Sequence, residues 1–152
     1  MKYIAIILLF LIGCHSDNGE FKNFVVKTVH ADSAGVLDLN KYDAVDWNKM
    51  YIIRPYSTRQ LLDDRVRLYQ IEVFNTGIAH QDTFVVMLLF KDDKLVNLTK
   101  FTGEIEFRKI TKNSSKGIAE PYEKSDAIFK FTKRYFTDKG KQKSYIEIAP
   151  LN

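Results

Sequence analysis

The sequence predicts an α+β domain in which an antiparallel sheet of about six to eight strands packs against one short helix. Most of the chain consists of short runs rich in Val, Ile, Phe, Tyr and Thr between polar turn residues, which is typical of strands. Only residues 59–67 combine apolar side chains with a polar helix face. The 152 residues are 13% aromatic and include 7 Gly and 3 Pro, so one folded domain is expected and a collagen-like or disordered chain is excluded.

The first expected strands lie before Pro55. Residues 24–29 form an apolar run that we expect to be a strand ending at the small and polar residues 31–35. Residues 36–39 predict a short extended segment. Residues 49–54 predict a stronger strand, which ends at Pro55 because proline has no N–H group to donate to a sheet.

The expected helix follows directly. Ser57 and Thr58 provide side-chain oxygens that can cap its N-terminus. Its apolar side chains are Leu61, Leu62 and Val66, with polar residues on the other face. Because residues 59–67 make a short helix, packing rather than intrinsic propensity must stabilise it.

Strands are expected again over the rest of the chain. Residues 69–74 alternate between polar and apolar side chains. Residues 84–90 are apolar throughout, which predicts a central strand covered on both faces. Residues 91–94 predict a tight turn into a strand at 95–99. The remaining expected strands are residues 104–109, 127–133 and 144–149, with a turn at 139–141.

The N-terminus predicts an export signal. Residues 4–12 are an uninterrupted apolar run behind the positive charge of Lys2. The run is far shorter than the ~20 residues of a membrane-spanning helix and matches the ~7–15-residue apolar core of a secretory signal peptide. A buried strand or helix is the alternative, but the run lacks the polar alternation of either.

The end of this run resembles a known motif. Leu11-Ile12-Gly13-Cys14 resembles the lipobox of bacterial lipoprotein precursors. The resemblance implies that residues 1–13 are a cleaved signal peptide and that Cys14 carries acyl chains such as palmitate, which hold the protein at the membrane. We expect residues 14–22 to be a polar tether and residues 23–152 to be the folded domain. His15, in the place where Asp commonly signals inner-membrane retention, favours the periplasmic side of the outer membrane if the host is Gram-negative.

A second resemblance lies in the mature part. Residues 47–57 are similar to a Trp-Asp-Lys-x-Tyr-Ile-x-x-Pro-Tyr-Thr segment of small uncharacterised bacterial secreted proteins and lipoproteins. The similarity covers residues 36–101, departs at Asn48, Ser57 and Asp93, and implies a fold and an envelope location without any activity. Its three aromatic residues are either core side chains or an exposed patch that binds a partner: Trp47, Tyr51 and Tyr56.

Two His-x-Asp pairs are candidate metal ligands. His30 precedes Asp32, and His80 precedes Asp82, with one residue between the members of each pair. An imidazole and a carboxylate two residues apart on a strand share a face and can bind one ion. Solvated turn residues are the better interpretation, because a metal site must assemble more ligands than one pair supplies.

Other catalytic patterns are missing from the sequence. There is no Gly-x-Ser-x-Gly or Ser-x-x-Lys motif and no glycine-rich phosphate loop, and the single cysteine excludes an internal disulfide. The carboxylate pairs Asp63-Asp64 and Glu104/Glu106 match the polar surface of a helix and of a strand. We therefore expect no catalytic residue and no cofactor.

Basic residues concentrate near the C-terminus of a chain whose net charge is +4. They are interleaved with aromatic residues between positions 129 and 143: Lys130, Lys133, Arg134, Lys139, Lys141 and Lys143. Export argues against a nucleic-acid partner. The remaining interpretations are lysines that keep sheet edges from aggregating and a surface that contacts anionic lipid head groups.

Together these observations predict a lipid-anchored cell-envelope protein, bound to membrane lipid through Cys14, that is non-enzymatic and binds another envelope or secreted protein as an inhibitor, immunity or assembly factor. The alternative is a small metal- or ligand-binding lipoprotein, or a hydrolase, that uses His30 and His80.

Overall fold

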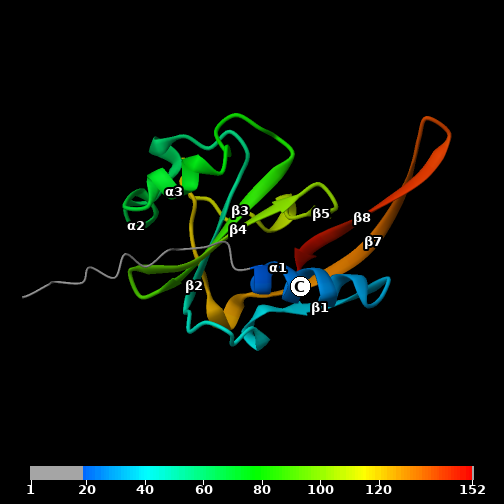
Figure 1. Ribbon diagram of the computed structural model, residues 1–152, viewed down its shortest axis with the longest axis horizontal. Helices are drawn as coiled ribbons and strands as arrows, with labels where there is room; N and C mark the ends of the chain where they lie inside the picture. Colours follow the sequence, from blue (N-terminus) through cyan, green and yellow to red (C-terminus); the bar gives the residue numbers. More distant parts are fainter. Residues whose placement is uncertain (1–18, 152) are drawn as a thin grey trace, which may run out of the picture.

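The computed structural model describes residues 19–151, and these form an α+β fold with two four-stranded sheets instead of the single sheet expected (Figure 1). The expected signal peptide and Cys14 lie outside the described residues. The helices are α1 (Gly19–His30), α2 (Asp64–Arg67) and α3 (Gln70–Asn75), and the 3₁₀ turns are η1 (Leu39–Lys41), η2 (Arg59–Leu61), η3 (Arg108–Ile110) and η4 (Lys124–Asp126). The strands are β1 (Ala34–Asp38), β2 (Lys49–Ile53), β3 (Phe84–Lys91), β4 (Lys94–Thr102), β5 (Ile105–Glu106), β6 (Tyr122–Glu123), β7 (Ile128–Asp138) and β8 (Lys141–Pro150).

The central sheet has the order β4-β3-β2-β6, and all its strands are antiparallel. Every residue from Phe84 to Phe90 of β3 is buried, as the apolar run predicted, because both faces of this sheet are covered. One face carries Met50, Ile52 and Met87 into a cluster with α1 and the other sheet. The opposite face carries Tyr51, Leu88 and neighbouring side chains into a second cluster under α2 and α3.

The outer sheet has the order β1-β7-β8-β5, with only the β5–β8 pair parallel. Leu37, Phe129 and Ile148 on its inner face join the cluster between the sheets. Gly35 lies directly opposite Phe131, and the absence of a side chain there leaves space for the phenyl ring. The strand predicted at residues 104–109 is shorter in the structure, where β5 has only two residues and is followed by η3.

Helix α1 overturns two predictions. Residues 24–29 are helical rather than extended, and Gly19–Lys22, expected in the tether, form the first turn of the same helix. Phe21, Val25 and Val29 recur every four residues and are fully buried, which is the pattern of a helix face on a core. Glu20 in the first turn and Lys27 in the last turn complement the helix dipole.

The helical layer over the central sheet also differs from the prediction. The helix expected at residues 59–67 is divided into η2 and α2, because Asp63 leaves the helix and caps α2 by accepting a 2.9 Å hydrogen bond from the Val66 N–H group. Residues 69–74, expected as a strand, lie mainly in α3, which buries Val73 and exposes Ile71. No helix among residues 19–151 is long and apolar enough to cross a membrane.

The C-terminal strands form a long hairpin that extends away from the rest of the fold (Figure 1). Strand β1 pairs with residues 128–132 of β7, and β5 pairs with residues 146–147 of β8. Residues 134–145 are therefore a two-stranded segment without a third strand, which we call the hairpin arm. The turn predicted at residues 139–141 is present, with positive φ at Lys139 and Gly140.

Candidate functional site

The candidate site begins at the turn that follows β2. The N–H group and the hydroxyl of Ser57 both donate to the carbonyl of Arg54, at 3.3 and 2.7 Å. Between them Pro55 and Tyr56 occupy the middle of a turn in which Tyr56 has a φ of +57°. Proline followed by a residue with positive φ is the pattern of a type II β-turn. A left-handed backbone costs a non-glycine residue ~1 kcal/mol or more, so this turn holds Tyr56 in an unfavourable conformation.

The backbone of this turn is also fixed from outside. The N–H group of Tyr56 donates a 2.8 Å hydrogen bond to the carbonyl of Ile78, which is buried in the segment after α3. The side chain of Tyr56 is nevertheless 57% exposed. A rigid backbone therefore presents an aromatic ring to solvent.

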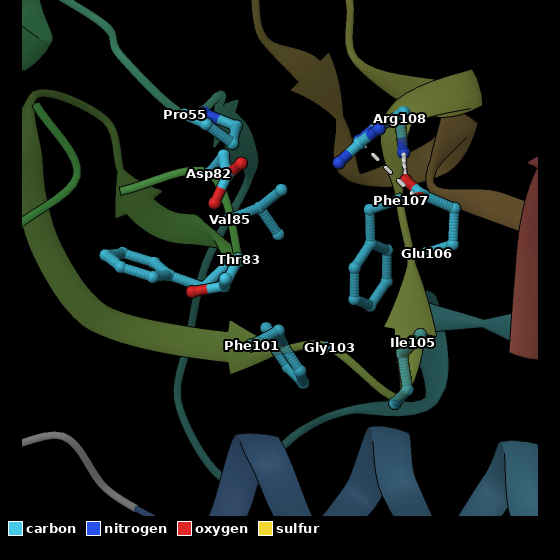
Figure 2. A pocket seen from close by; sticks show the side chains of 11 residues that line it. Pro55, Asp82, Thr83, Val85, Phe101, Gly103, Ile105, Glu106, Phe107 and Arg108 are labelled. Atoms are coloured by element: carbon cyan, nitrogen blue, oxygen red, sulfur yellow. Dashed lines mark hydrogen bonds and ion pairs between the residues drawn. The ribbon is translucent and has the colours of Figure 1, made fainter. Parts of the chain in front are cut away.

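Next to this turn lies a cavity of about 280 Å³ between the start of β3, the end of β4 and β5 (Figure 2). Apolar side chains from these strands and from Phe107 line it: Val85, Phe101, Ile105 and Phe107. Figure 2 shows Pro55 and Asp82 on one side of the cavity and Arg108 on the other. The cavity therefore combines an apolar lining with charged groups at its sides.

A second cavity, of about 430 Å³, shares Pro55, Asp82 and Arg108 with the first and adjoins it. Its further lining comes from the turn after β2, from η2 and from the loop after η3: Arg54, Tyr56, Ser57, Leu61, Asn113, Gly117 and Ala119. We call the two cavities together the Pro55 groove. The groove is formed where the turn after β2, the residues before β3 and η3 lie next to one another.

The charged groups of the Pro55 groove are only partly paired. The Arg108 Nε atom lies 3.5 Å from Oε2 of Glu106, and the Arg108 N–H group donates to Oε1 of the same carboxylate at 2.8 Å. Within residues 19–151, the side chains of Arg54 and Asp82 make no hydrogen bond or ion pair. The groove can therefore offer guanidinium donors and a carboxylate acceptor to a ligand.

The three aromatic candidates differ in their exposure to solvent. Trp47 is 1% exposed and donates a 3.1 Å hydrogen bond from Nε1 to the carbonyl of Tyr42. Tyr51 is fully buried, and its hydroxyl donates to Asp63 at 2.7 Å. Both residues belong to the core, the first of the two alternatives for these aromatic residues, and neither is part of an exposed partner-binding patch. Tyr56 alone keeps the exposure that partner binding requires.

The two histidines lie at the surface of different segments. His30 ends α1 and lines a cavity of about 580 Å³ with residues of β4, whereas His80 lies after α3, where its N–H group donates to the Gly77 carbonyl. In the described part of the chain, no three His, Cys, Asp or Glu side chains are grouped so that they could hold a metal ion. The His-x-Asp pairs therefore find no third ligand there.

Three of the four carboxylates in the candidate pairs have structural partners. Asp63 caps α2, and Asp64 lies 3.0 Å from Arg67 on the same helix. Glu106 is bound to Arg108. The ion pairs of Asp64 and Glu106 fit the expected surface role, whereas the capping of α2 by Asp63 was not predicted.

Sequence reasoning found Tyr56 but missed Asp82 and Arg108 as parts of one groove. No local pattern joins these positions, because only the tertiary fold brings their loops together. Comparisons of the chain with protein-family models, with curated proteins and with solved structures found no match.

Proposed function

We propose that this chain is a lipid-anchored protein of the bacterial cell envelope, attached through Cys14, and that it binds a segment of another protein in the Pro55 groove. In this proposal it is a non-enzymatic binding module of the inhibitor, immunity or assembly type. The observation that carries the proposal is the exposed ring of Tyr56, held at a φ of +57° beside the groove. Unfavourable backbone conformations of this kind concentrate at functional sites.

The size and chemistry of the groove favour a peptide segment. The two cavities, of about 280 and 430 Å³, share Pro55, Asp82 and Arg108 and can therefore take neighbouring side chains of one segment. An apolar partner side chain fits the lining of Phe101 and Phe107, while Arg54 and Asp82 remain free to bind polar or charged groups of the same segment. An apolar anchor surrounded by polar groups is typical of protein interfaces.

Tyrosine and arginine are the residue types that most often dominate binding energy at protein interfaces. The groove presents Tyr56 together with Arg54 and Arg108. Tyr56 contributes a large contact area with few rotatable bonds, and its backbone is already fixed by the hydrogen bond to Ile78. Little backbone conformational entropy is then lost at this residue when a partner binds.

The test is affinity capture from the native envelope with the wild-type chain and with Tyr56→Ala, followed by binding measurements on the purified captured protein. We expect Tyr56→Ala to weaken binding about tenfold or more. Tyr135→Ala is the matched control, because Tyr135 is also exposed but lies on the hairpin arm. Equal affinity of wild-type and Tyr56→Ala chains for every captured protein would refute the groove as the binding site.

The membrane anchor has its own test. Cys14→Ser removes the thiol to which acyl chains are attached, so lipidation and normal processing should stop. If the variant is still cleaved normally and held at the membrane, the lipoprotein part of the proposal is wrong, whatever the result for Tyr56.

A further inference from the structure

The hairpin arm exposes an aromatic ring on each of its faces. Tyr135 is 60% exposed and Phe136 46% exposed, although both lie within a regular antiparallel ladder. Successive residues of a strand point to opposite faces, so the two rings lie on different sides of the arm. A two-stranded hairpin is only marginally stable by itself, and exposed aromatic rings on such an arm indicate a surface that contacts something.

The face that carries Phe136 is continuous with the uncovered side of the outer sheet. Residues directly opposite one another share a face, and Phe136 lies opposite Lys143, while Arg134 lies opposite Tyr145. We call this surface the Phe136 face. Its basic and aromatic members on β7 and β8 are Lys130, Arg134, Phe136, Lys141, Lys143 and Tyr145.

The rings of Phe136 and Tyr145 pack edge to face, with their centroids 6.0 Å apart. Together they form an apolar centre with basic side chains around it. Tyr135 lies on the other face, where Lys133 approaches its ring at 5.7 Å and the opposite residue is Ser144. Only the Phe136 face therefore combines two aromatic rings with several basic residues.

The charge of this region is strongly one-sided. Residues 130–143 contain six basic residues and one acidic residue, so their net charge of +5 exceeds the +4 of the whole chain. The two acidic side chains that β7 and β8 place on this face have partners: Glu147 lies 2.8 Å from Lys109 and 3.0 Å from Arg134, and Asp138 is paired with Lys143. Among the described residues, Lys130 and Lys141 make no ion pair.

The turn at the end of the arm adds a further basic residue at a structural cost. Lys139 has a φ of +49° and Gly140 a φ of +75°, which is the pattern of a type I′ turn. Asn or Gly is normally preferred at the first of these positions, because a left-handed backbone is unfavourable for other residues. A lysine there places a positive charge where the backbone geometry favours Asn, Asp or Gly.

From these observations we infer that the Phe136 face of the hairpin arm docks on an anionic phospholipid surface. The free lysines bind lipid phosphates, and the rings of Phe136 and Tyr145 enter the head-group layer, where aromatic side chains are favoured. The arm lies along the membrane instead of entering tip first, because a tip-first approach would carry Lys139 deeper than the rings. This contact is independent of the Pro55 groove and of the acyl chains expected on Cys14.

The test places a fluorescent probe on each face of the arm in the full chain. Phe136→Trp and Tyr135→Trp introduce an indole at neighbouring positions, and the native Trp47, which is 1% exposed, gives the same background in both. Each variant is mixed with vesicles of phosphatidylcholine alone or with added phosphatidylglycerol, in which the acyl chains carry bromine atoms that quench a nearby indole. We expect strong quenching at position 136 with anionic vesicles only, and weak quenching at position 135.

Charge variants complete the test. In the Phe136→Trp chain, Lys130→Gln with Lys141→Gln should weaken binding to anionic vesicles about 30-fold, since each basic residue near the surface contributes about fivefold. Lys94→Gln with Lys116→Gln removes the same charge from exposed sites outside the arm and should have little effect on the quenching at position 136. Circular dichroism establishes that each variant is folded.

Three results would overturn the inference: equal quenching at positions 135 and 136, equal quenching with neutral vesicles, or equal weakening by the two lysine pairs. If an acidic protein changes the indole fluorescence at position 136 and no vesicle does, the face binds a protein partner and the inference is wrong.

Discussion

The hydroxyl group of Tyr51 donates a 2.7 Å hydrogen bond to Oδ2 of Asp63, and this contact joins the central sheet to α2. The other oxygen of the same carboxylate caps α2 by accepting from Val66. Arg65 extends the network, because its Nη1 donates to the Tyr51 hydroxyl at 3.0 Å and its Nε to Asp93 at 2.6 Å. One buried phenol thus holds together β2, α2 and the turn between β3 and β4.

Tyr51→Phe should lower the free energy of unfolding by ~1–2 kcal/mol, because it removes one hydrogen bond to a carboxylate and one from a guanidinium group. Burial and the hydrogen bond to Asp63 raise the pKa of Tyr51, so the phenol stays protonated and available as a donor at neutral pH. Urea denaturation measures the change. Tyr56→Phe is the control, since the exposed Tyr56 hydroxyl makes no hydrogen bond within the described residues. Equal stability of wild-type and Tyr51→Phe chains would show that the network contributes nothing.

The close approach of β1 to β7 predicts a second effect. A Cβ atom added at Gly35 would lie 2.8 Å from Cζ of Phe131, whose side chain is 3% exposed and cannot move into solvent. Gly35→Ala should therefore destabilise the fold by ~1–3 kcal/mol through overpacking. Gly103→Ala serves as the control, because a Cβ there meets no atom within 4 Å.

A double variant shows whether the cause is the phenyl ring. Phe131→Leu shortens the side chain that the added Cβ atom would meet, so the destabilisation caused by Gly35→Ala should be smaller in the Phe131→Leu background. Thermal unfolding of the wild type, the two single variants and the double variant gives this coupling. Strictly additive effects would contradict the proposed clash.

The sequence predicted those elements whose local pattern matches their final environment. Strand β3 was found because both faces of its apolar run are buried, and the turn at residues 91–94 was found from its polar residues. Helix α1 was mistaken for a strand because consecutive apolar residues at 24–26 masked the four-residue spacing of its buried face. Helix α3 was missed because its polar-apolar alternation suits a strand, and packing on the central sheet overrides that preference.

The pairing of the strands and the Pro55 groove could not be predicted from the local pattern of the sequence. Strand β1 pairs with β7, whose partner residues lie 90 to 98 positions later, and nothing in either segment specifies this partner. Pro55, Asp82 and Arg108 lie in separate connections that meet only in the folded chain. Tyr56 was identified because it lies in a distinctive aromatic segment directly after a strong strand.

Asn48, which stands where the similar Trp-Asp-Lys segment has Asp, makes two hydrogen bonds with Asp92. Asn48 donates from Nδ2 to Asp92 at 2.8 Å, and its Oδ1 accepts from the Asp92 N–H group at 2.9 Å. Asn48→Asp would replace the donor with a carboxylate facing that of Asp92. We expect a loss of ~1 kcal/mol in stability, measured by urea denaturation.

Adding Asp92→Asn to the Asn48→Asp chain restores an amide donor in this contact and should reverse the loss of stability. Asp92→Asn also suits the left-handed backbone at this position, where φ is +54°. The double variant should therefore be more stable than Asn48→Asp alone. No recovery would mean that Asn48 and Asp92 are not energetically coupled.

Glu147 predicts a pH dependence. Its hydrogen bonds with Lys109 and then with Arg134 lower the pKa of its carboxyl below the usual value of 4.5. A lowered pKa in the folded state gives a stabilising contribution that is present above the usual pKa and is lost as the pH falls through the folded value. The difference in melting temperature between wild type and Glu147→Gln should therefore be largest near neutral pH and shrink in acid. Glu72→Gln, at an exposed position without an ion pair among the described residues, should show no such trend. A constant difference over the whole pH range would contradict the assignment.

The turn of the hairpin arm allows stability and membrane contact to be separated. Lys139→Asn relieves the unfavourable backbone at a φ of +49° and creates the Asn-Gly pair that type I′ turns prefer, so it should stabilise the fold by ~0.5–1 kcal/mol and raise the melting temperature by a few degrees. Lys141→Asn removes the same charge from a strand position and should bring no such gain. Because each variant loses one lysine of the arm, both should bind anionic vesicles more weakly than the wild-type chain. An unchanged or lower melting temperature of the Lys139→Asn chain would show that Lys139 is not under backbone strain. The lysine at this turn would then no longer support a contact of the hairpin arm with anionic lipid.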